Sequence, residues 1–141
     1  MNGAKESAFQ FTNPLLMDLN FSVSREYTGS SDVDDIDIPI EMKVLKPNAS
    51  ECNDRTAFVV LVVKVGEKTA EFPYCITVEM GASFRWDESV PTEMAEALLS
   101  RNAPALLLGY IRPYIAQITE ASPIGAVHVP FMNFNPQPPQ Q

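Results

Sequence analysis

Residues 56–80 read TAFVVLVVKVGEKTAEFPYCITVEM, and this stretch predicts a β-hairpin. Its first strand, residues 56–65, is rich in β-branched side chains and apolar on both faces, which is typical of a central strand covered on both sides. A short turn follows at 66–68, where a glycine begins the sequence GEK. From 72 to 80, apolar residues alternate with mostly polar ones, which indicates a second strand with one buried face.

Two more strands are predicted before the hairpin. Apolar residues occupy every second position of 15–23 and of 36–44, which is the period of a strand with one buried face. Pro39 lies within the second run and lacks the amide that a central strand donates. We therefore expect that strand to start after Pro39 or to lie at an edge of the sheet.

A long helix with a defect is predicted after the hairpin. Pro91 followed by Glu93 is a favourable helix start, and leucine and isoleucine recur at helical spacing from 107 to 118. Pro104 should bend or divide this helix, because proline lacks the amide that helical hydrogen bonding needs.

The order of these segments predicts the fold class. Four strands followed by helical material, without strict alternation, indicate an α+β protein in which helices cover one face of an antiparallel sheet. The sequence SPIG at 122–125 ends the helix, and 126–134 continue as an extended crossover segment. One domain is expected over 1–134, followed by a disordered tail of Pro and Gln at 135–141.

Charge and composition exclude several classes of partner. The net charge is -8, and the 10 Lys and Arg residues are scattered, whereas phosphate-binding surfaces need clustered basic side chains. We therefore expect no nucleic-acid partner and no binding to anionic membranes. No stretch reaches the ~18 apolar residues of a membrane span, so no membrane insertion is expected. Cys52 and Cys75 are the only cysteines, which is consistent with a reducing compartment, and we expect a cytoplasmic protein.

The sequence lacks the residue patterns of common enzyme and metal sites. His128 is the only histidine, and no G-x-S-x-G nucleophile motif accompanies it. The two cysteines form no C-x-x-C motif and cannot assemble a four-ligand zinc site with one histidine. No glycine-rich phosphate-binding loop occurs, and the acidic run DVDDID at 32–37 fails the calcium-loop template. We therefore expect no metal, no cofactor and no enzymatic activity.

Two charged features have structural interpretations. Glu93 and Glu96 lie one helical turn apart, near a predicted helix N-terminus where negative charge is favourable. Arg112 lies in an otherwise apolar helix, so its side chain should snorkel to the surface or pair with a nearby carboxylate.

What remains is an excess of apolar and aromatic side chains near or beyond the ends of the predicted elements. Aromatic and methionine side chains can line grooves that accept varied apolar segments, and they can equally belong to the core. Both interpretations stay open for Phe84, Trp86, Tyr110, Tyr114, Phe131, Met132 and Phe134.

Several short motifs, in this order of elements, resemble the SecB family of cytosolic export chaperones. The resemblance spans most of residues 9–134. The segments that carry it are F-x-F at 9–11, MDLNF at 17–21, GASF at 81–84, TEMA at 92–95, NAP at 102–104 with the leucine-rich turn after it, Tyr114, Pro130, and Asn133 with Phe134.

The resemblance implies a four-stranded antiparallel sheet with a long helix packed on it, and assembly into a dimer or a dimer of dimers. Family members hold unfolded preproteins in long apolar grooves without ATP, and many pass them to the motor SecA. The usual second helix is short or absent here, because the proline-glutamine tail begins at Asn135. An exposed first strand would also favour a homo-oligomer on physical grounds, since unpaired edge amides invite pairing with another copy.

The resemblance also places site residues. The groove-lining aromatic of the fourth strand corresponds to Tyr74, and the groove beneath the crossover segment lies near Phe134. Asp18 matches one acidic contact to SecA, whereas Ser22 and Thr77 stand where glutamates are expected. Together with the aromatic residues above, the expected client-binding set is Tyr74, Phe84, Trp86, Phe131, Met132 and Phe134.

Three functions are consistent with these observations. The leading hypothesis is an ATP-independent holdase that binds unfolded or pre-secretory polypeptides for export. The first alternative is a dedicated chaperone of one antitoxin or other single partner. The second alternative is a small enzyme or ligand-binding domain with a closed apolar pocket between helix and sheet.

Overall fold

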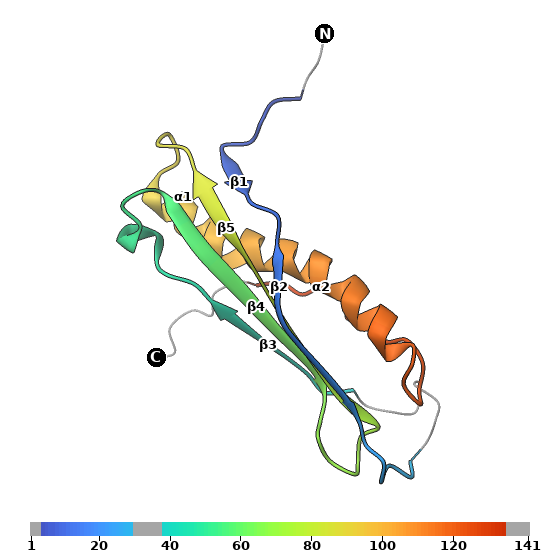
Figure 1. Cartoon of the computed structure of the whole chain (residues 1–141). Helices are drawn as coiled ribbons and strands as arrows, with labels where there is room; N and C mark the ends of the chain where they lie inside the picture. Colours follow the sequence, from blue (N-terminus) through green and yellow to red (C-terminus); the bar gives the residue numbers. More distant parts are fainter. Residues whose placement is uncertain (1–3, 30–37, 135–141) are drawn as a thin grey trace.

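The computed structural model describes residues 4–29 and 38–134. One long helical segment packs on one face of an antiparallel sheet, as Figure 1 shows, and this confirms the predicted α+β class. The predicted tail at 135–141 and the acidic run at 32–37 lie outside the described residues.

Five strands form the sheet in the order β1-β5-β4-β3, with β2 also pairing with β5. They are β1 (Phe9–Phe11), β2 (Leu15–Val23), β3 (Ile40–Leu45), β4 (Thr56–Gly66) and β5 (Tyr74–Trp86). Because β1 and β2 both pair with β5, they are two pieces of one edge strand, and Pro14 lies in the break between them. The other edge is β3, which starts directly after Pro39 as predicted. The predicted four-stranded sheet is confirmed, with its first strand extended by β1.

The β4–β5 hairpin is the centre of the sheet, as predicted, but its connection is longer than the expected turn. β5 begins at Tyr74 and extends to Trp86, beyond the predicted end at 80, because the alternation continues with Ala82, Phe84 and Trp86 buried. At the end of β4, Gly66 has a φ of +85°, and a Cβ there would lie 2.1 Å from the Tyr74 carbonyl oxygen. Only glycine fits this position without strain.

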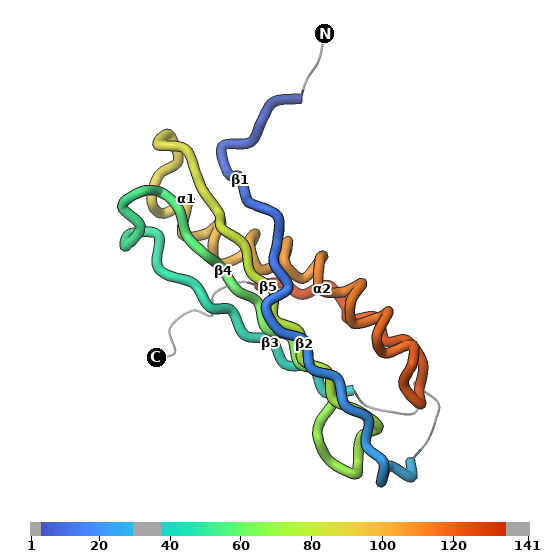
Figure 2. The backbone as a smooth tube through the Cα atoms, in the orientation of Figure 1, coloured from blue at the N-terminus to red at the C-terminus, as the bar shows by residue number. Residues whose placement is uncertain are grey.

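The helices cover only one face of the sheet (Figure 2). Side chains of β4 and β5 alternate between a buried row on the covered face and a more accessible row on the other, which we call the uncovered face. On the uncovered face Phe58 is 40% exposed. The prediction that 56–65 is covered on both sides is therefore wrong, since among the described residues no second layer packs there. The buried row comprises Val59, Leu61, Val63, Val65, Tyr74, Ile76, Val78, Met80, Ala82, Phe84 and Trp86.

The helical segment has three pieces: α1 (Thr92–Ala97), a π-helical turn η3 (Leu98–Asn102) and α2 (Ala103–Thr119). Its start directly after Pro91 confirms the predicted N-terminus. The predicted defect takes the form of the π turn, in which the Ala103 amide donates to the Leu98 carbonyl. Pro104 follows at once, so the widened turn accommodates a residue with no amide to donate.

The core lies between the covered face of the sheet and α2. α2 buries Leu107, Leu108, Ile111 and Ile115 against β4 and β5. Their spacing places them on one stripe of the helix. Complete burial of one such side chain contributes about 1.5–3 kcal/mol, so this contact is sufficient to hold the helix on the sheet.

A polar contact fixes α1. Glu96 accepts hydrogen bonds from the Ala49 amide at 2.6 Å and the Ser100 hydroxyl at 3.3 Å, and it forms an ion pair with Lys46. Ala49 begins the 3-10 turn η2 (Ala49–Glu51) after β3, so Glu96 joins this loop to the helix. Glu96 thus has specific partners in addition to the favourable helix-terminal position expected from the sequence.

After α2 the chain turns at 120–125, where Gly125 has a φ of +80°, and returns as the crossover segment, residues 126–134. Residues 126–134 form neither a helix nor a strand, which is consistent with the predicted crossover segment. Within the residues described up to 134, no helix follows α2.

Candidate functional site

Metal-binding and membrane-spanning features were sought among the described residues. There, no group of three or more His, Cys, Asp or Glu could hold a metal ion. In the same ranges no helix is long and apolar enough to cross a bilayer. His128 is exposed on the crossover segment, and Cys52 and Cys75 are free thiols. The notable features of the surface are instead apolar.

The structure separates the expected client-binding residues into two groups. Tyr74, Phe84 and Trp86 belong to the core cluster between sheet and helix. By contrast, Phe131 is 74% exposed and Met132 is 44% exposed on the crossover segment. Phe134 is partly buried against the core. A partner could therefore reach the second group directly, whereas it would reach the first only after the packing had opened.

Tyr74 combines complete burial with an unsatisfied hydroxyl. Its ring packs at 5.8 Å from that of Phe21 and at 5.3 Å from that of Phe72. The hydroxyl has no hydrogen-bond partner among the described residues, and burial raises the pKa of Tyr74 to about 12. A buried polar group without a partner destabilises a fold by about 1–3 kcal/mol, so this hydroxyl is a ready donor for any acceptor that enters beside it.

Two contacts fasten the crossover segment to α2. The Val127 amide donates to the Thr119 hydroxyl at 2.8 Å, and that hydroxyl donates to the Ile115 carbonyl at 2.6 Å. One further step along, Arg112 donates from Nε to the Val129 carbonyl at 2.5 Å. Because Val127 and Val129 are both buried, the segment lies on the helix in a fixed register.

Arg112 has a different role from the one expected from the sequence. Its guanidinium carbon lies 4.2 Å from the centre of the Phe131 ring, in addition to the hydrogen bond to Val129. Of the two alternatives expected from the sequence, snorkelling or pairing with a carboxylate, the second is not found among the described residues. A backbone carbonyl and an aromatic face replace it, because the crossover segment brings both within reach. Arg112 thus sets the position of the exposed Phe131, and we call Phe131, Met132 and Phe134 the crossover surface.

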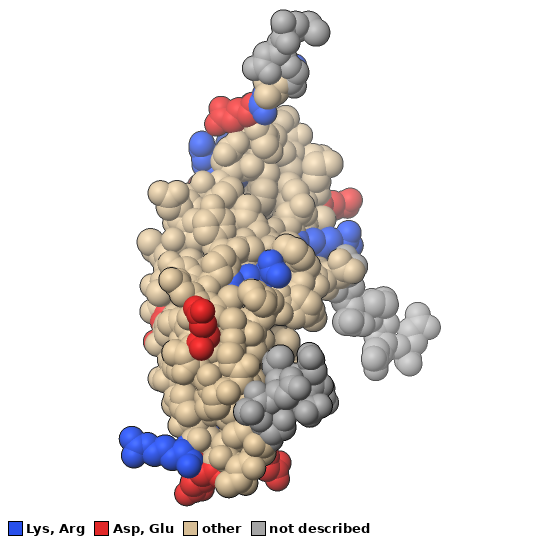
Figure 3. Space-filling model, turned by 90° about the vertical axis from the view of Figure 1, so that its right-hand side faces the viewer, with Lys and Arg blue, Asp and Glu red and all other residues tan. Residues whose placement is uncertain are grey.

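A second apolar surface lies where β1 and β2 meet α2. Phe11 stacks on Phe84 at 5.9 Å and meets Tyr110 edge-on at 6.4 Å. Tyr114, one turn further along α2, is also exposed, as is Leu16 on β2. Figure 3 looks onto the side of the molecule that carries α2, where uncharged residues dominate and charged side chains are scattered. We call Phe11, Leu16, Tyr110 and Tyr114 the edge surface.

The sequence singled out only part of this edge surface. Tyr110 and Tyr114 were expected to lie either in a groove or in the core, and both are exposed. Phe11 was noted only as part of a family motif, and Leu16 fell on the polar-facing side of the predicted strand. Pairing of Leu16 with Met80 places it on the covered face, because a bulge between Leu16 and Asp18 reverses the alternation. The apolar residues at every second position of 15–23 give no signal for such a bulge.

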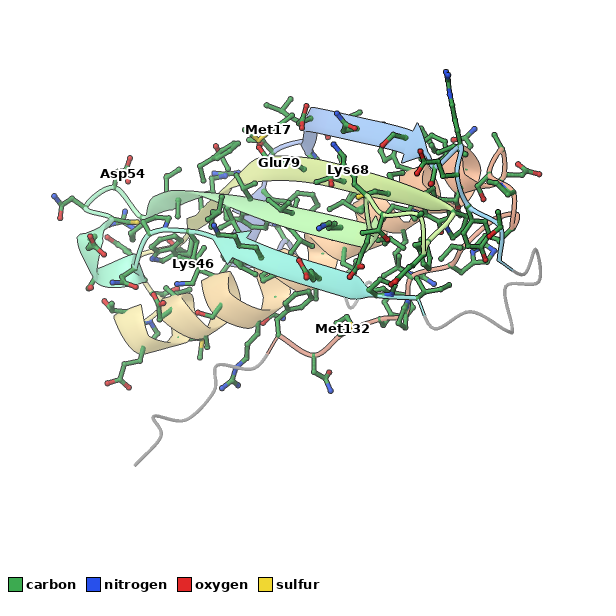
Figure 4. All side chains as sticks on the ribbon, turned by 90° about the horizontal axis from the view of Figure 1, so that it is seen from below. Met17, Lys46, Asp54, Lys68, Glu79 and Met132 are labelled. Atoms are coloured by element: carbon green, nitrogen blue, oxygen red, sulfur yellow. The ribbon has the colours of Figure 1, made fainter. Side chains whose placement is uncertain are left out.

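Asp18 lies away from both surfaces. It pairs across the sheet with Glu79, and Asn20 and Ser22 follow it on the uncovered face, opposite Thr77 and Cys75. Figure 4 labels Glu79 on β5 and Met17 next to Asp18 on β2. Asp18 and Glu79 therefore form a small acidic pair on the uncovered face.

The fold matches that of a SecB-like chaperone from Mycobacterium tuberculosis, solved in complex with a peptide from an antitoxin. The TM-score is 0.66 and the sequence identity 14%, over 89% of this chain and 91% of the other. This protein has the SecB-like fold. The resemblance predicted from short motifs is confirmed at the level of the fold, at an identity too low for the sequences alone to establish it.

The remaining comparisons add little to the SecB-like assignment. A protein of unknown function from Streptococcus agalactiae aligns with a TM-score of 0.47 and 14% identity, over 87% of this chain and 97% of the other. No family model matches this chain, and no curated protein matches it in sequence.

Proposed function

We propose that this SecB-like protein is an ATP-independent chaperone that holds unfolded polypeptides, including preproteins on their way to export. The observation that carries the proposal is the pair of exposed apolar surfaces on either side of α2, the crossover surface and the edge surface. An acidic protein keeps such surfaces in contact with water only at a cost, and exposed apolar patches mark sites of association. The fold of the solved SecB-like chaperone, which was captured with a peptide, supports a polypeptide as the ligand.

The chemistry of the two surfaces suits unfolded segments of varied sequence. Phe131 and Met132 offer an aromatic ring and a flexible thioether, which adapt to different apolar side chains. Arg112 keeps the Phe131 ring in place from its other face. At the edge surface, the outer side of β2 carries backbone groups that no described strand pairs with, so an extended segment can add to the sheet there.

Self-association is part of the same proposal. The outer edge of β2 can pair with β2 of a second copy, which gives a dimer with isologous contacts, and two such dimers can combine. In an oligomer of this kind the edge surface would be shared between copies, whereas the crossover surface would stay available for clients. We place this assembly in the cytoplasm, where the free thiols of Cys52 and Cys75 would remain reduced.

Transfer to the motor SecA is a finer element of the proposal. Docking would depend on Asp18 and Glu79 on the uncovered face, because Ser22 and Thr77 stand where the family has further glutamates. Replacing Asp18 by Asn should then weaken binding to purified SecA without changing client binding.

A second candidate is a dedicated chaperone of one partner. The observation that favours it is the solved SecB-like structure, which contains a peptide from an antitoxin. The two candidates differ in client range, so purification of the tagged protein from native cells separates them. A single stoichiometric partner supports the dedicated chaperone, and a mixture of unfolded clients supports the general holdase.

A refolding assay tests the proposal. The protein in excess should delay aggregation of a chemically denatured client, and Phe131→Ala combined with Met132→Ala should weaken this effect. Met94→Ala is the matched control, because Met94 is a 55% exposed apolar residue on α1, away from both surfaces. Equal protection by all three proteins would remove the crossover surface from the proposal, and no protection by the wild type would remove the holdase function.

A further inference from the structure

A polar cavity of about 540 Å³ lies at the end of the sheet where β4 begins and β5 ends. Figure 4 marks this end of the molecule by Asp54. The cavity is separate from the crossover surface, because its strand residues Gln10, Thr56 and Arg85 belong to the uncovered face. Among the residues of its wall are Glu6, Gln10, Arg55, Thr56, Arg85 and Trp86.

Arg85 occupies the middle of the cavity wall. It pairs across the sheet with Gln10 of β1 on one side and with Thr56 of β4 on the other. Directly opposite residues on one face of a sheet have their Cβ atoms about 4.5–5.5 Å apart, so Gln10, Arg85 and Thr56 form one row. Gln10 Nε2 donates to the Ser7 carbonyl at 3.0 Å, and the Thr56 hydroxyl donates to the Asp54 carbonyl at 3.4 Å. This row presents several hydrogen-bond donors to one ligand.

Arg55 adds a second guanidinium from the loop before β4. Its φ of 54° is in the left-handed region, which non-glycine residues seldom adopt. Two backbone hydrogen bonds hold it there, from its amide to the Cys52 carbonyl and from the Trp86 amide to its own carbonyl. The chain is therefore fixed at Arg55, next to the end of β5.

Neither guanidinium is neutralised by a carboxylate of the described residues. Within 4–29 and 38–134 the one ion pair is that of Lys46 with Glu96. The wall also carries three carboxylates, Glu6, Asp54 and Asp87, and none of them pairs with an arginine within these residues. Asp54 accepts the Thr56 amide, and Asp87 accepts the Glu88 amide and the Ser89 hydroxyl. Two unpaired arginines beside Gln10 and Thr56 form a site for an oxyanion, and a carboxylate matches their planar geometry.

An apolar shelf adjoins this oxyanion site on the uncovered face. Phe58 is next to Thr56 on the same face of β4, and its ring lies over Gly81, where a Cβ would come within 2.7 Å of it. Leu15 is the opposite neighbour of Gly81 on β2 and is 59% exposed. The Met17 sulfur also lies close to Gly81, 3.0 Å from where a Cβ of residue 81 would be. The shelf formed by Leu15, Met17 and Phe58 therefore begins one residue pair away from Arg85.

We propose that this cavity and shelf bind the free C-terminus of a polypeptide whose last residue is apolar. The terminal carboxylate contacts Arg85 and Arg55, and the last side chain lies on Phe58 and Leu15. Gln10 and Thr56 can bond the peptide groups that precede it. A fatty acid would carry the same carboxylate, but its alkyl chain needs an enclosed apolar pocket, whereas this shelf is flat and half exposed. The inference does not depend on the chaperone function proposed above, since its site lies on the other face of the sheet.

Trp86 provides a direct measurement. It is the only tryptophan of the chain and lines the cavity, so its fluorescence reports ligand binding without a label. The probes are two soluble octapeptides of Gly, Ser and Asn that end in Leu, one with a free carboxylate and one with a C-terminal amide. The full-length protein should bind the acid at least about tenfold more tightly than the amide, because a charge-assisted pair is lost in the amide. Added salt should reduce this difference.

Variants locate the site. Arg85→Gln should abolish the preference for the acid, and Arg55→Asn should reduce it while keeping a residue that tolerates positive φ. Arg101→Gln is the control, because it removes the same charge from an exposed position at η3. Each variant's unfolding midpoint shows that it is folded, and the Arg55 variant keeps the test available if Arg85→Gln fails to fold.

Three outcomes would overturn the inference. Equal binding of acid and amide would exclude the carboxylate site. A loss in Arg101→Gln as large as in Arg85→Gln would mean that only net charge matters. Displacement of the peptide by decanoate at equal concentration would assign the site to fatty acids rather than to polypeptides. A double variant of Phe131 and Met132 should bind the acid peptide normally, so failure of the chaperone proposal and failure of this one are distinguishable.

Discussion

Thr119 and Val127 are joined by one buried hydrogen bond, and this bond closes the turn between α2 and the crossover segment. The Val127 amide donates to Thr119 Oγ1 at 2.8 Å, and both residues are buried. The same hydroxyl donates to the Ile115 carbonyl, so one side chain satisfies a helix carbonyl and a crossover amide. This contact therefore helps to position the segment that carries the crossover surface.

Thr119→Val should therefore loosen the crossover segment. The substitution keeps the shape but leaves the Val127 amide buried and unpaired, which destabilises the fold by about 1–3 kcal/mol. Urea unfolding measures the loss, and hydrogen exchange should show faster exchange at Val127. Thr119→Ser keeps the hydroxyl and should restore slow exchange. Unchanged protection of Val127 in the valine variant would contradict this role.

Tyr74→Phe should not destabilise the protein at neutral pH. The hydroxyl that it removes has no partner among the described residues, so the variant should be as stable as the wild type or up to about 1 kcal/mol more stable. If the hydroxyl instead donates to a client, the variant should bind clients less tightly. A large loss of stability would show that the hydroxyl has a partner in the folded protein.

The burial of the Tyr74 hydroxyl should also make the protein less stable at alkaline pH. The pKa of Tyr74 is raised by burial from 10.0 to about 12, so the unfolded chain releases this proton at a lower pH than the folded one. Stability present below pH 10 is then lost as the pH rises through the folded pKa, by on the order of 2–3 kcal/mol. Urea unfolding from pH 8 to 12 should show a smaller loss in Tyr74→Phe, whereas the exposed Tyr110→Phe should follow the wild type.

The sequence predicted the arrangement of the fold better than it predicted the site. Period-two patterns indicated β2, β3 and β5, because each of these strands has one buried face. The same pattern could not say whether Phe84 and Trp86 were covered, since alternation shows which residues share a face but not which face a helix covers. The contact between Lys46 and Glu96 joins positions 50 residues apart and has no local signal. The bulge before Asp18, which sets the edge surface, likewise left no mark in the sequence.

Glu96 should stabilise the fold at neutral pH and lose this contribution at acidic pH. Burial raises the pKa of its carboxyl, but the hydrogen bond from Ala49 and the contacts with Lys46 and Ser100 outweigh burial, so the pKa is lowered below 4.5. A lowered pKa stabilises the fold above the ordinary value, and this contribution disappears as the pH falls through the folded pKa. Glu96→Gln should therefore cost about 1 kcal/mol at pH 7 and less at pH 3. Unfolding midpoints across this range measure the effect.

Gly81→Ala and Gly109→Ala should have opposite effects. A Cβ at Gly81 would come within 2.7 Å of the Phe58 ring, so overpacking should destabilise the fold by about 1–3 kcal/mol. A Cβ at Gly109, on α2, meets nothing within 4 Å, and alanine there should stabilise the helix by about 0.5–1 kcal/mol. Unfolding free energies measure both. Adding Phe58→Ala should remove most of the cost at Gly81, and simple additivity of the two changes would show that the ring is not the obstacle.

Pro14 determines how long a strand can grow on the outside of the sheet. The edge is interrupted between β1 and β2, and the bulge between Leu16 and Asp18 disturbs the ladder further, so only 18–23 offers regular pairing. This is about 20 Å of strand, in which about three residues direct their backbone N–H and C=O groups outward toward an added chain. A longer regular edge would bind an added polypeptide for longer and would favour edge-to-edge aggregation into fibres. In the holdase function proposed above, the broken edge would limit how long a bound segment stays paired.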